Sequence, residues 1–257
     1  MKVRFGRLVR FGQVMMSVAG LAILCWGAYE IVVYVRTAPR FDVQKLSVSG
    51  ARRVAENDVI ARAGFETGTN IFRVNLEEMR RRVEELSWVR YAAVQRILPD
   101  QIVIRIVERE PIGLTRIKGE IYQFDIDGRI LDPDPASGSS FPILDGLRAG
   151  DRKTNVRKVE TYRSVLEELD QTSLSEVHIN DSNEVTIVSA NDPLLINLGM
   201  SDFRNRWIKY LQLKPQIQQQ YPQAVRVDLR FKNQVIIKMK DDEAGEKIVW
   251  GTKKNTL

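Results

Sequence analysis

The longest apolar stretch of the chain lies near its N-terminus, at residues 14–35, and more than 200 residues of mixed polarity follow it. At about 1.5 Å of rise per residue, a helix of this length crosses a hydrocarbon core roughly 30 Å thick. A cleavable signal peptide has a shorter apolar region and ends in small residues, whereas this stretch ends in Val33-Tyr34-Val35-Arg36. The pattern therefore predicts an uncleaved transmembrane helix at residues 14–35.

The charges that flank this span bear on its orientation. The first thirteen residues contain four basic side chains and no acid, namely Lys2, Arg4, Arg7 and Arg10. Basic residues also follow the span, so the positive-inside rule gives only a weak bias. Because long domains translocate largely regardless of charge, we expect residues 1–13 to form a cytoplasmic tail. Glu30, the one ionisable residue of the span, either contacts a partner helix or reaches the headgroups.

Residues 41–110 show the pattern of one compact unit in the order strand, helix, helix, strand, strand. Alternation around 46–48 predicts the first strand, and Gly64 is a plausible end for the first helix. Asn75 is expected to cap the second helix, and Glu78 is expected to return the bond in a capping box. The last two strands are expected at 89–98 and 101–107, joined at Pro99-Asp100.

Residues 111–240 predict a second α+β domain with a mostly antiparallel sheet. The Asp127-Gly128 pair between apolar alternating runs is typical of a hairpin. A helix is expected at 156–169, and another is expected to be capped by Ser201 and bent or ended by Pro215. Strands are expected at 122–126, 129–131, 176–180, 184–189, 194–198, 225–231 and 234–239, and a loop at 132–142.

The C-terminal residues 241–257 are charged and have no regular pattern, so we expect a flexible tail. Trp250 is an exception within it. This residue is either a contact for a partner or part of a short extra strand, or it belongs to a disordered end.

The net charge of +6 is concentrated at the N-terminus. Four of these charges lie in the first thirteen residues and Glu30 offsets one, so residues 36–257 carry only about +3. This leaves little support for a nucleic-acid partner, and the basic tail is better explained as a topology signal and a contact for anionic lipid. The single cysteine, Cys25, lies within the span, so the outer part has no disulfide to stabilise it.

No catalytic, cofactor or metal site is expected, and no small-molecule substrate. His178 lies in a predicted strand without the partners that a triad or a metal centre needs. Asp125, Asp127, Asp132 and Asp134 suggest a calcium loop, but their spacing does not fit the EF-hand template. A turn followed by a solvated loop explains them better.

The most distinctive motif of the chain is Trp88-Val89-x-x-Ala92-x-Val94-x-Arg96-x-x-Pro99-x-x-Ile102-x-Ile104-x-Ile106-x-Glu108-Arg109-x-Pro111. It resembles the POTRA domain, the polypeptide-transport-associated module with the order β-α-α-β-β. A basic tail, one span, one such module and a second, mostly β region together resemble the FtsQ/DivIB family of bacterial division proteins. The resemblance covers nearly the whole chain.

This resemblance implies a scaffold of the division machinery and not an enzyme. Proteins of the family hold the small single-pass proteins FtsB and FtsL, and so help to recruit or regulate septal peptidoglycan synthesis. The resemblance also implies a place in the inner membrane at the division septum, with the N-terminus in the cytoplasm and the folded domains in the periplasm. The septal synthase complex would be an indirect partner, and inner-membrane lipid a direct contact.

The partner-binding residues are expected at the last strand, 234–239. Its apolar residues have little visible protection beyond Lys238, and an unpaired strand edge can accept a strand from a partner. The alternative is that the same residues only close the core of the second domain. The predicted site consists of Phe231, Gln234, Val235, Ile236, Ile237 and Lys238.

Two other functions remain open at this stage. One is a POTRA-containing chaperone or transport component of the envelope, although such proteins usually carry several POTRA units or a membrane barrel. The other is an anchored enzyme that acts on cell-wall polymers, which a turnover assay on peptidoglycan would reveal.

Overall fold

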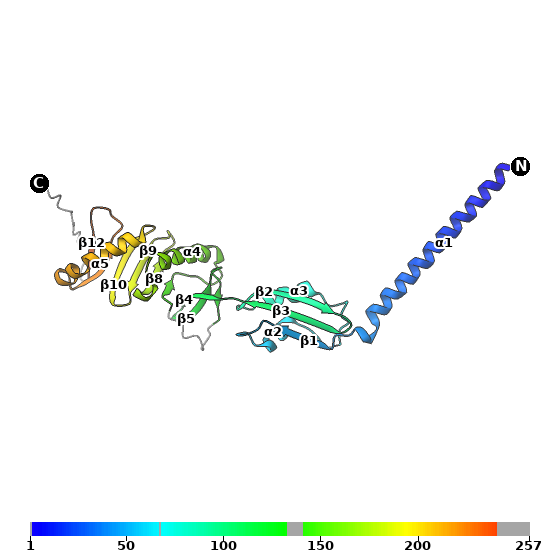
Figure 1. The fold of residues 1–257 in the computed structure, drawn as a ribbon, viewed down its shortest axis with the longest axis horizontal. Coiled ribbons are helices and arrows are strands. Elements are labelled where there is room, and N and C mark those ends of the chain that lie inside the picture. Colours follow the sequence, from blue (N-terminus) through cyan, green and yellow to red (C-terminus); the bar gives the residue numbers. More distant parts are fainter. Residues whose placement is uncertain (1, 67, 133–140, 241–257) are drawn as a thin grey trace. The chain divides into compact units, whose positions relative to one another are not determined.

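The computed structural model describes residues 2–66, 68–132 and 141–240, and the chain divides into two compact units between Glu108 and Arg109 (Figure 1). Each unit has its own hydrophobic core. The predicted tail at 241–257, with Trp250, lies outside the described residues. So does most of the predicted loop at 132–142, including Asp134.

The first unit begins with one long helix, α1 (Lys2–Thr37). Its stretch from Met15 to Thr37 has 23 residues and a mean hydropathy of 1.9, and none of it is buried against the rest of the chain. This stretch is long and apolar enough to cross a membrane, and it fits a single-pass membrane protein, as the sequence predicted. The helix starts well before the span, so the predicted tail is helical from Lys2 onward.

The rest of the first unit confirms the predicted order of strands and helices. The elements are η1 (Pro39–Phe41), β1 (Lys45–Ser49), α2 (Glu56–Ala63), α3 (Leu76–Glu84), β2 (Val89–Ile97) and β3 (Gln101–Glu108). Strand β3 lies in the middle of the sheet, parallel to β1 and antiparallel to β2. Ile102, Ile104 and Ile106 of β3 are buried together with residues of α2 and α3, so one apolar face of the sheet is covered by the two helices.

The cap of α3 forms only in part as predicted. The side chain of Asn75 accepts a hydrogen bond from the backbone N–H of Glu78 at 3.1 Å. The carboxylate of Glu78, however, binds Arg82 one turn further along the helix. The capping box is therefore half formed, because the charged guanidinium competes for the glutamate.

Two consecutive residues at the unit boundary each bind their own unit. Oε1 of Glu108 accepts hydrogen bonds from the backbone N–H groups of Arg52 and Arg53 at 2.8 Å and of Val54 at 3.0 Å. Burial tends to raise the pKa of Glu108, but these three bonds outweigh it and lower that pKa. Arg109 instead forms an ion pair with Asp125 of the second unit, which is only 2 % exposed.

The described residues of the second unit form nine strands and two long helices. Its strands are β4 (Pro111–Ile117), β5 (Glu120–Asp125), β6 (Ile130–Leu131), β7 (Ile143–Asp145), β8 (Leu174–Ile179), β9 (Val185–Ser189), β10 (Asp192–Gly199), β11 (Ala224–Asp228) and β12 (Ile236–Met239). The helices are α4 (Arg152–Glu168), the short η2 (Gln171–Ser173) and α5 (Phe203–Gln220).

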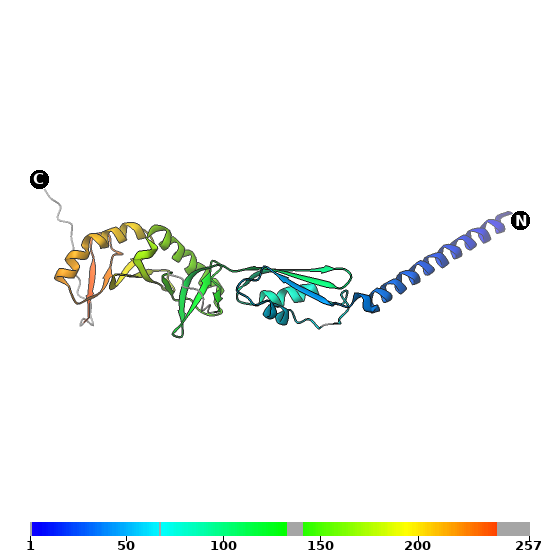
Figure 2. The same ribbon diagram turned by 60° about the horizontal axis from the view of Figure 1, so that its bottom comes forward.

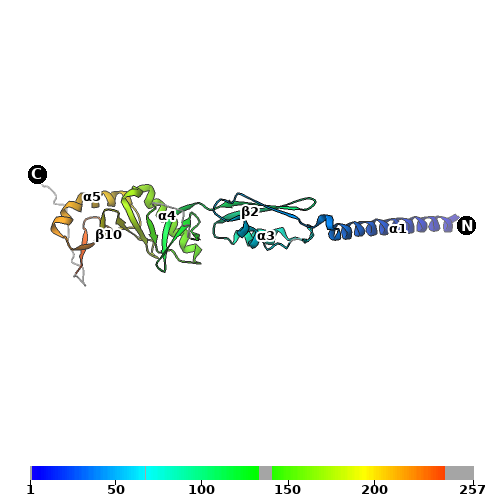
Figure 3. The ribbon, with the colours of Figure 1, turned by 90° about the horizontal axis from the view of Figure 1, so that it is seen from below.

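These nine strands form one mixed sheet in the order β12-β11-β10-β9-β8-β7-β4-β5-β6. Five of its pairings are antiparallel and three are parallel, so the prediction of a mostly antiparallel sheet is confirmed. Helices α4 and α5 cover one face of the sheet (Figures 2 and 3). The sequence prediction missed β4 and β7, both of which are half-buried and lack a clean polar alternation.

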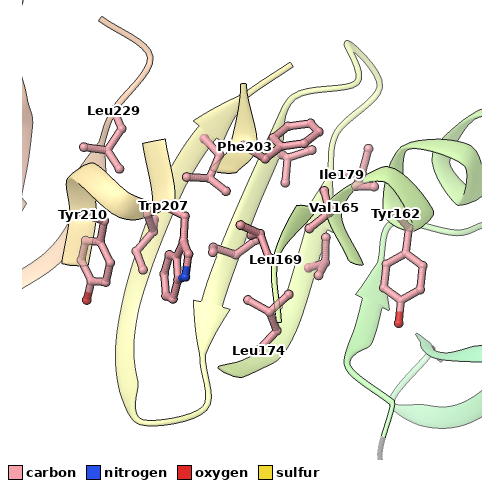
Figure 4. Close-up of a cluster of buried hydrophobic side chains, with 14 of the residues drawn as sticks. Tyr162, Val165, Leu169, Leu174, Ile179, Phe203, Trp207, Tyr210 and Leu229 are labelled. Atoms are coloured by element: carbon pink, nitrogen blue, oxygen red, sulfur yellow. The ribbon is translucent and has the colours of Figure 1, made fainter. Parts of the chain in front are cut away.

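The core of this unit lies between the helices and the sheet. Buried side chains of α4 and α5 pack together with buried residues of the strands (Figure 4). Two details of α5 bear on the prediction. Pro215 lies inside the helix, so of the two predicted effects, a bend or an end, the end is wrong. The N-cap position is occupied by Asp202 in a left-handed conformation, and not by Ser201.

Candidate partner-binding edge

The last two strands are shorter than the sequence predicted. Strand β11 ends at Asp228 instead of Phe231, and β12 begins at Ile236. A seven-residue loop, 229–235, replaces the predicted turn at Lys232-Asn233. The N–H of Leu229 donates to the carbonyl of Asn197, which is the last bond between β11 and β10, and the side chain of Leu229 is buried. The exposed part of the loop therefore begins after Leu229.

The six predicted binding residues differ in burial. Val235 and Ile237 are almost fully buried, at 1 % and 0 % exposure, and belong to the core. Phe231 and Lys238 are exposed, while Gln234 and Ile236 are half-buried. Ile236, Ile237 and Lys238 lie in β12, and the other three lie in the loop before it. Val235 and Ile237 have little side-chain surface to offer a partner.

Strand β12 is the terminal strand of the sheet, and only β11 pairs with it among the described residues. The backbone N–H of Lys240 donates to Gln223 at 3.1 Å. Because residues of an antiparallel strand alternate in the direction of their backbone groups, the groups of Ile237 and Met239 point away from β11. The register shift near Val225 adds a residue to β11 only, so it does not interrupt this alternation on β12.

Among the described residues, no strand pairs with the outer edge of β12, where the backbone groups of Ile237 and Met239 point outward and Lys238 is the predicted guard. Met239 was missed as a site residue, because sequence alternation identifies side-chain faces and not the direction of backbone groups.

Two cations face each other on the side of the sheet that α4 and α5 leave uncovered. Arg226 of β11 is directly opposite Lys238 of β12, and both side chains are exposed. Within the described part of the chain, neither has an acidic partner. Like charges directly opposite each other destabilise a strand pair, so this position favours an acidic group from outside.

The loop before β12 is held at its start by a network of charges. Arg230 donates to Asp228 at 2.7 Å and to Glu184 at 2.7 Å. The bonds to Asp228 and then to Glu184 raise the pKa of Arg230, so the guanidinium stays charged. Phe231 follows directly, 39 % exposed, with the Arg230 guanidinium 5.8 Å from its ring centre. The fixed arginine thus holds an exposed aromatic ring beside the last strand.

Helix α5 supports the edge from the other face of the sheet. Trp207 and Tyr210 stack at a centroid distance of 5.2 Å, and the Tyr210 hydroxyl donates to Asp192 of β10 at 2.7 Å. Burial, with the hydrogen bond to Asp192, raises the pKa of Tyr210, so the hydroxyl remains a donor. Val227 and Ile237 pack in the same cluster as these aromatic residues. Helix α5 therefore packs against the buried face of the strand pair that ends the sheet.

The residues that the sequence suggested for catalysis or metal binding lie close to oppositely charged side chains. The ring nitrogens of His178 lie 3.2 Å from carboxylate oxygens of Asp145 and Glu176. Asp127 is 3.2 Å from Arg109, which also pairs with Asp125. The described residues contain no cluster of histidine, cysteine or acidic side chains that would hold a metal ion.

Comparisons with known proteins identify both units. Residues 41–109 match the FtsQ-type POTRA domain, and residues 113–230 match the C-terminal domain of the cell division protein FtsQ/DivIB. The second match ends just before Phe231, so the predicted site residues lie beyond it.

Relatives that match most of this chain carry the same family name. A cell division protein FtsQ from Koribacter versatilis is 28 % identical, over 88 % of this chain and 69 % of its own. Another from Syntrophotalea carbinolica is 25 % identical, over 80 % of this chain and 76 % of its own. A solved extracytoplasmic domain of DivIB from Geobacillus stearothermophilus is 16 % identical, covers 44 % of this chain and 96 % of its own, and has a TM-score of 0.29, which is too low to add support. With both of its units assigned, the chain belongs to the FtsQ/DivIB family of bacterial cell division proteins.

Proposed function

We propose that this protein is a membrane-anchored scaffold of the bacterial division machinery that binds FtsB- and FtsL-type single-pass proteins by strand addition at β12. The observation that carries the proposal is the open edge of β12, where the backbone groups of Ile237 and Met239 point away from β11. A partner segment that pairs there extends the sheet and satisfies these groups. Through such partners the scaffold helps to recruit or regulate septal peptidoglycan synthesis.

The proposed topology follows from the single span. Residues 1–13 lie in the cytoplasm, α1 crosses the inner membrane, and both folded units lie in the periplasm. The membership of the FtsQ/DivIB family supports a place at the septum, where the protein meets its partners.

Side chains around the edge give the partner its selectivity. Phe231 and the half-buried Ile236 supply apolar surface, while Arg226 and Lys238 supply two adjacent positive charges. The segment that fits is therefore extended and apolar, with an acidic residue opposite the two cations. Each backbone hydrogen bond contributes only about 1 kcal/mol, so the side-chain contacts decide the affinity.

A proline at Met239 tests the proposal most directly. Met239→Pro removes an outward N–H group while the preceding residue keeps its extended conformation. Met239→Ala is the matched control, because it loses the same side chain but keeps the N–H. A proline at Ile236 would be less informative, since the N–H of Ile236 points toward β11. Titration of full-length protein in detergent with the purified FtsB-like protein of the same bacterium measures the affinity.

We expect Met239→Pro to bind about tenfold more weakly than Met239→Ala, which corresponds to about 1.4 kcal/mol. Equal affinities of the two variants would show that β12 does not accept a strand. Location is a separate test: a fluorescent fusion that labels the whole envelope and never midcell would contradict the division role.

A further inference from the structure

The end of the POTRA unit nearest α1 carries exposed apolar and basic side chains that no part of the proposed function uses. Phe72 is 37 % exposed, Ile97 46 % and Leu98 58 %. Arg40 and Arg73 are also exposed: Arg73 directly follows Phe72, and Arg40 precedes Phe41, whose ring packs against Phe72.

A chain of hydrogen bonds ties this surface to the last turns of α1. The side chain of Asn70 is only 6 % exposed and donates to the backbone carbonyl of Val35 at 3.0 Å. The same side chain accepts a bond from the N–H of Phe72 at 3.0 Å. Val35 lies within the stretch that is apolar enough to cross a membrane. The loop that carries Phe72 is therefore within hydrogen-bond reach of the end of the span.

The turn between β2 and β3 is joined to the same loop. Nε of Arg96 donates to the carbonyl of Ile71 at 2.8 Å, and its Nη2 donates to the carbonyl of Val74 at 2.5 Å. Leu98 comes two residues later, and the β2–β3 turn lies at the end of the unit that adjoins α1 in every view (Figures 1, 2 and 3). The carbonyl of Asp100 also accepts from the N–H groups of residues 44 and 45, shortly after the span.

The composition of this surface matches that of a membrane interface. Phe41 and Phe72 pack edge to face at 5.4 Å, and the guanidinium of Arg40 lies 5.8 Å from the ring centre of Phe41. Aromatic rings at the headgroup level and basic side chains that meet anionic lipids are the features of interfacial segments.

We propose that Phe72, Leu98, Arg40 and Arg73 form a second membrane contact, in which the loop and the β2–β3 turn of the POTRA unit lie among the headgroups of anionic phospholipids around the span. This contact would fix the position of the POTRA unit at the bilayer surface. The proposal rests on the insertion of α1 in the membrane, as the proposed function does, but it does not depend on β12.

Labels on single cysteines test this contact in the full-length protein. The native Cys25, within the span, reports insertion. In a Cys25→Ala background, a polarity-sensitive fluorophore is attached to Leu98→Cys or to Phe72→Cys. Val107→Cys is the matched control, because Val107 is 57 % exposed, as Leu98 is, but lies near the other end of β3. The proteins are placed in nanodiscs of phosphatidylcholine with phosphatidylglycerol, with nitroxides on the headgroups or deep in the acyl chains.

We expect the label on Cys25 to be quenched by the deep nitroxide and the labels at 98 and 72 by the headgroup nitroxide, with a blue shift, while the label at 107 is not quenched. Replacing Arg40 and Arg73 by glutamine, or omitting phosphatidylglycerol, should reduce the quenching at 98. Labels at 98 and 72 that behave like the label at 107 would overturn the proposal. So would a loss of quenching at Cys25, which would also remove the anchor. Loss of partner binding by Met239→Pro leaves these readings unchanged, so the two proposals fail separately.

Discussion

The two hairpins β2–β3 and β11–β12 have opposite places in their sheets. The β2–β3 pair has eight residue pairs in register and includes the central strand of its sheet. The β11–β12 pair has four, is joined by a seven-residue loop, and ends its sheet. The first hairpin carries the clearest sequence motif of the chain, whereas the second lies at and beyond the limit of the family match.

This difference shows that a clear sequence pattern belongs to a strand with one covered and one open face. Strand β3 alternates apolar and polar residues cleanly because one of its faces is covered by helices and the other is not. Strand β12 shows little alternation because its half-buried Ile236 lies on the face without helices.

Truncation of matched isoleucines should separate the two hairpins most. Ile104 and Ile237 are both fully buried, but Ile104 is enclosed by neighbours on two strands. We expect Ile104→Ala to lower the free energy of unfolding of its unit by about 4 kcal/mol and Ile237→Ala by about 2 kcal/mol, since an edge strand can collapse into the cavity. Hydrogen exchange with mass spectrometry on the full chain resolves the two units. Equal losses of unfolding free energy in the two variants would contradict the expected difference between a central strand and an edge strand.

Substitutions of the two boundary residues, Glu108 and Arg109, should show whether the two units unfold separately. Arg109→Ala leaves Asp125 buried with one fewer cation, so we expect the second unit to lose about 3 kcal/mol while the POTRA unit is unchanged. Arg116→Ala is the control, because its pair with Glu176 is open to solvent and should contribute little to stability. The same exchange experiment reports both. A comparable loss in the POTRA unit would show that the two units do not unfold separately.

Substitution of Glu108 should have a smaller effect, and it should lower the stability of the POTRA unit instead of the second unit. Glu108→Gln keeps an acceptor but removes the charge, so we expect the POTRA unit to lose about 1 kcal/mol at neutral pH, reduced by solvent screening. The pKa of Glu108 in the folded protein is lower than the ordinary 4.5. Its contribution is therefore complete above about pH 4.5 and disappears as the pH falls through the lowered pKa. Stability curves of the two proteins that stay parallel down to that pH range would argue against this role of the charge.

The smallest effect should appear in the unsubstituted protein, as a difference in the exchange rates of backbone amides between the two hairpins. The N–H groups of Ile237 and Met239 should exchange faster than those of Ile102 and Ile104, because the edge amides have no strand to bond to in the described part of the chain. Addition of the FtsB-like partner should slow the first pair only. Protection of the edge amides in the isolated protein would mean that another segment already covers β12.

The fold was largely predictable where the apolar periodicity agrees with the positions of capping and turn residues. The span, the order of the POTRA elements and the helices α4 and α5 follow from apolar spacing and capping residues. Strand β7 was not predictable, because both of its pairings are with strands distant in sequence. Strand β4 forms a hairpin with β5, but its sequence lacks the polar alternation that would have indicated a strand. The end of α5 was not predictable from Pro215, because a proline in a helix can bend it without ending it.

The candidate site was predictable only as a segment. The segment 234–239 was predicted from its apolar residues, without an assignment of its faces. Strand β11 ends where its pairing with β10 and β12 ends, at Asp228, and the opposition of Arg226 and Lys238 depends on a register that includes an extra residue in β11. Both are consequences of tertiary pairing, which no local pattern records.

The far end of the large sheet sets a limit on stoichiometry. Strand β6 has only two residues, Ile130 and Leu131, of which Leu131 is fully buried, so that border is too short to accept an incoming segment. Under the proposed strand addition, the large sheet of each copy would take one guest strand, at β12. The two outer strands of the small sheet, β1 and β2, are not subject to this limit.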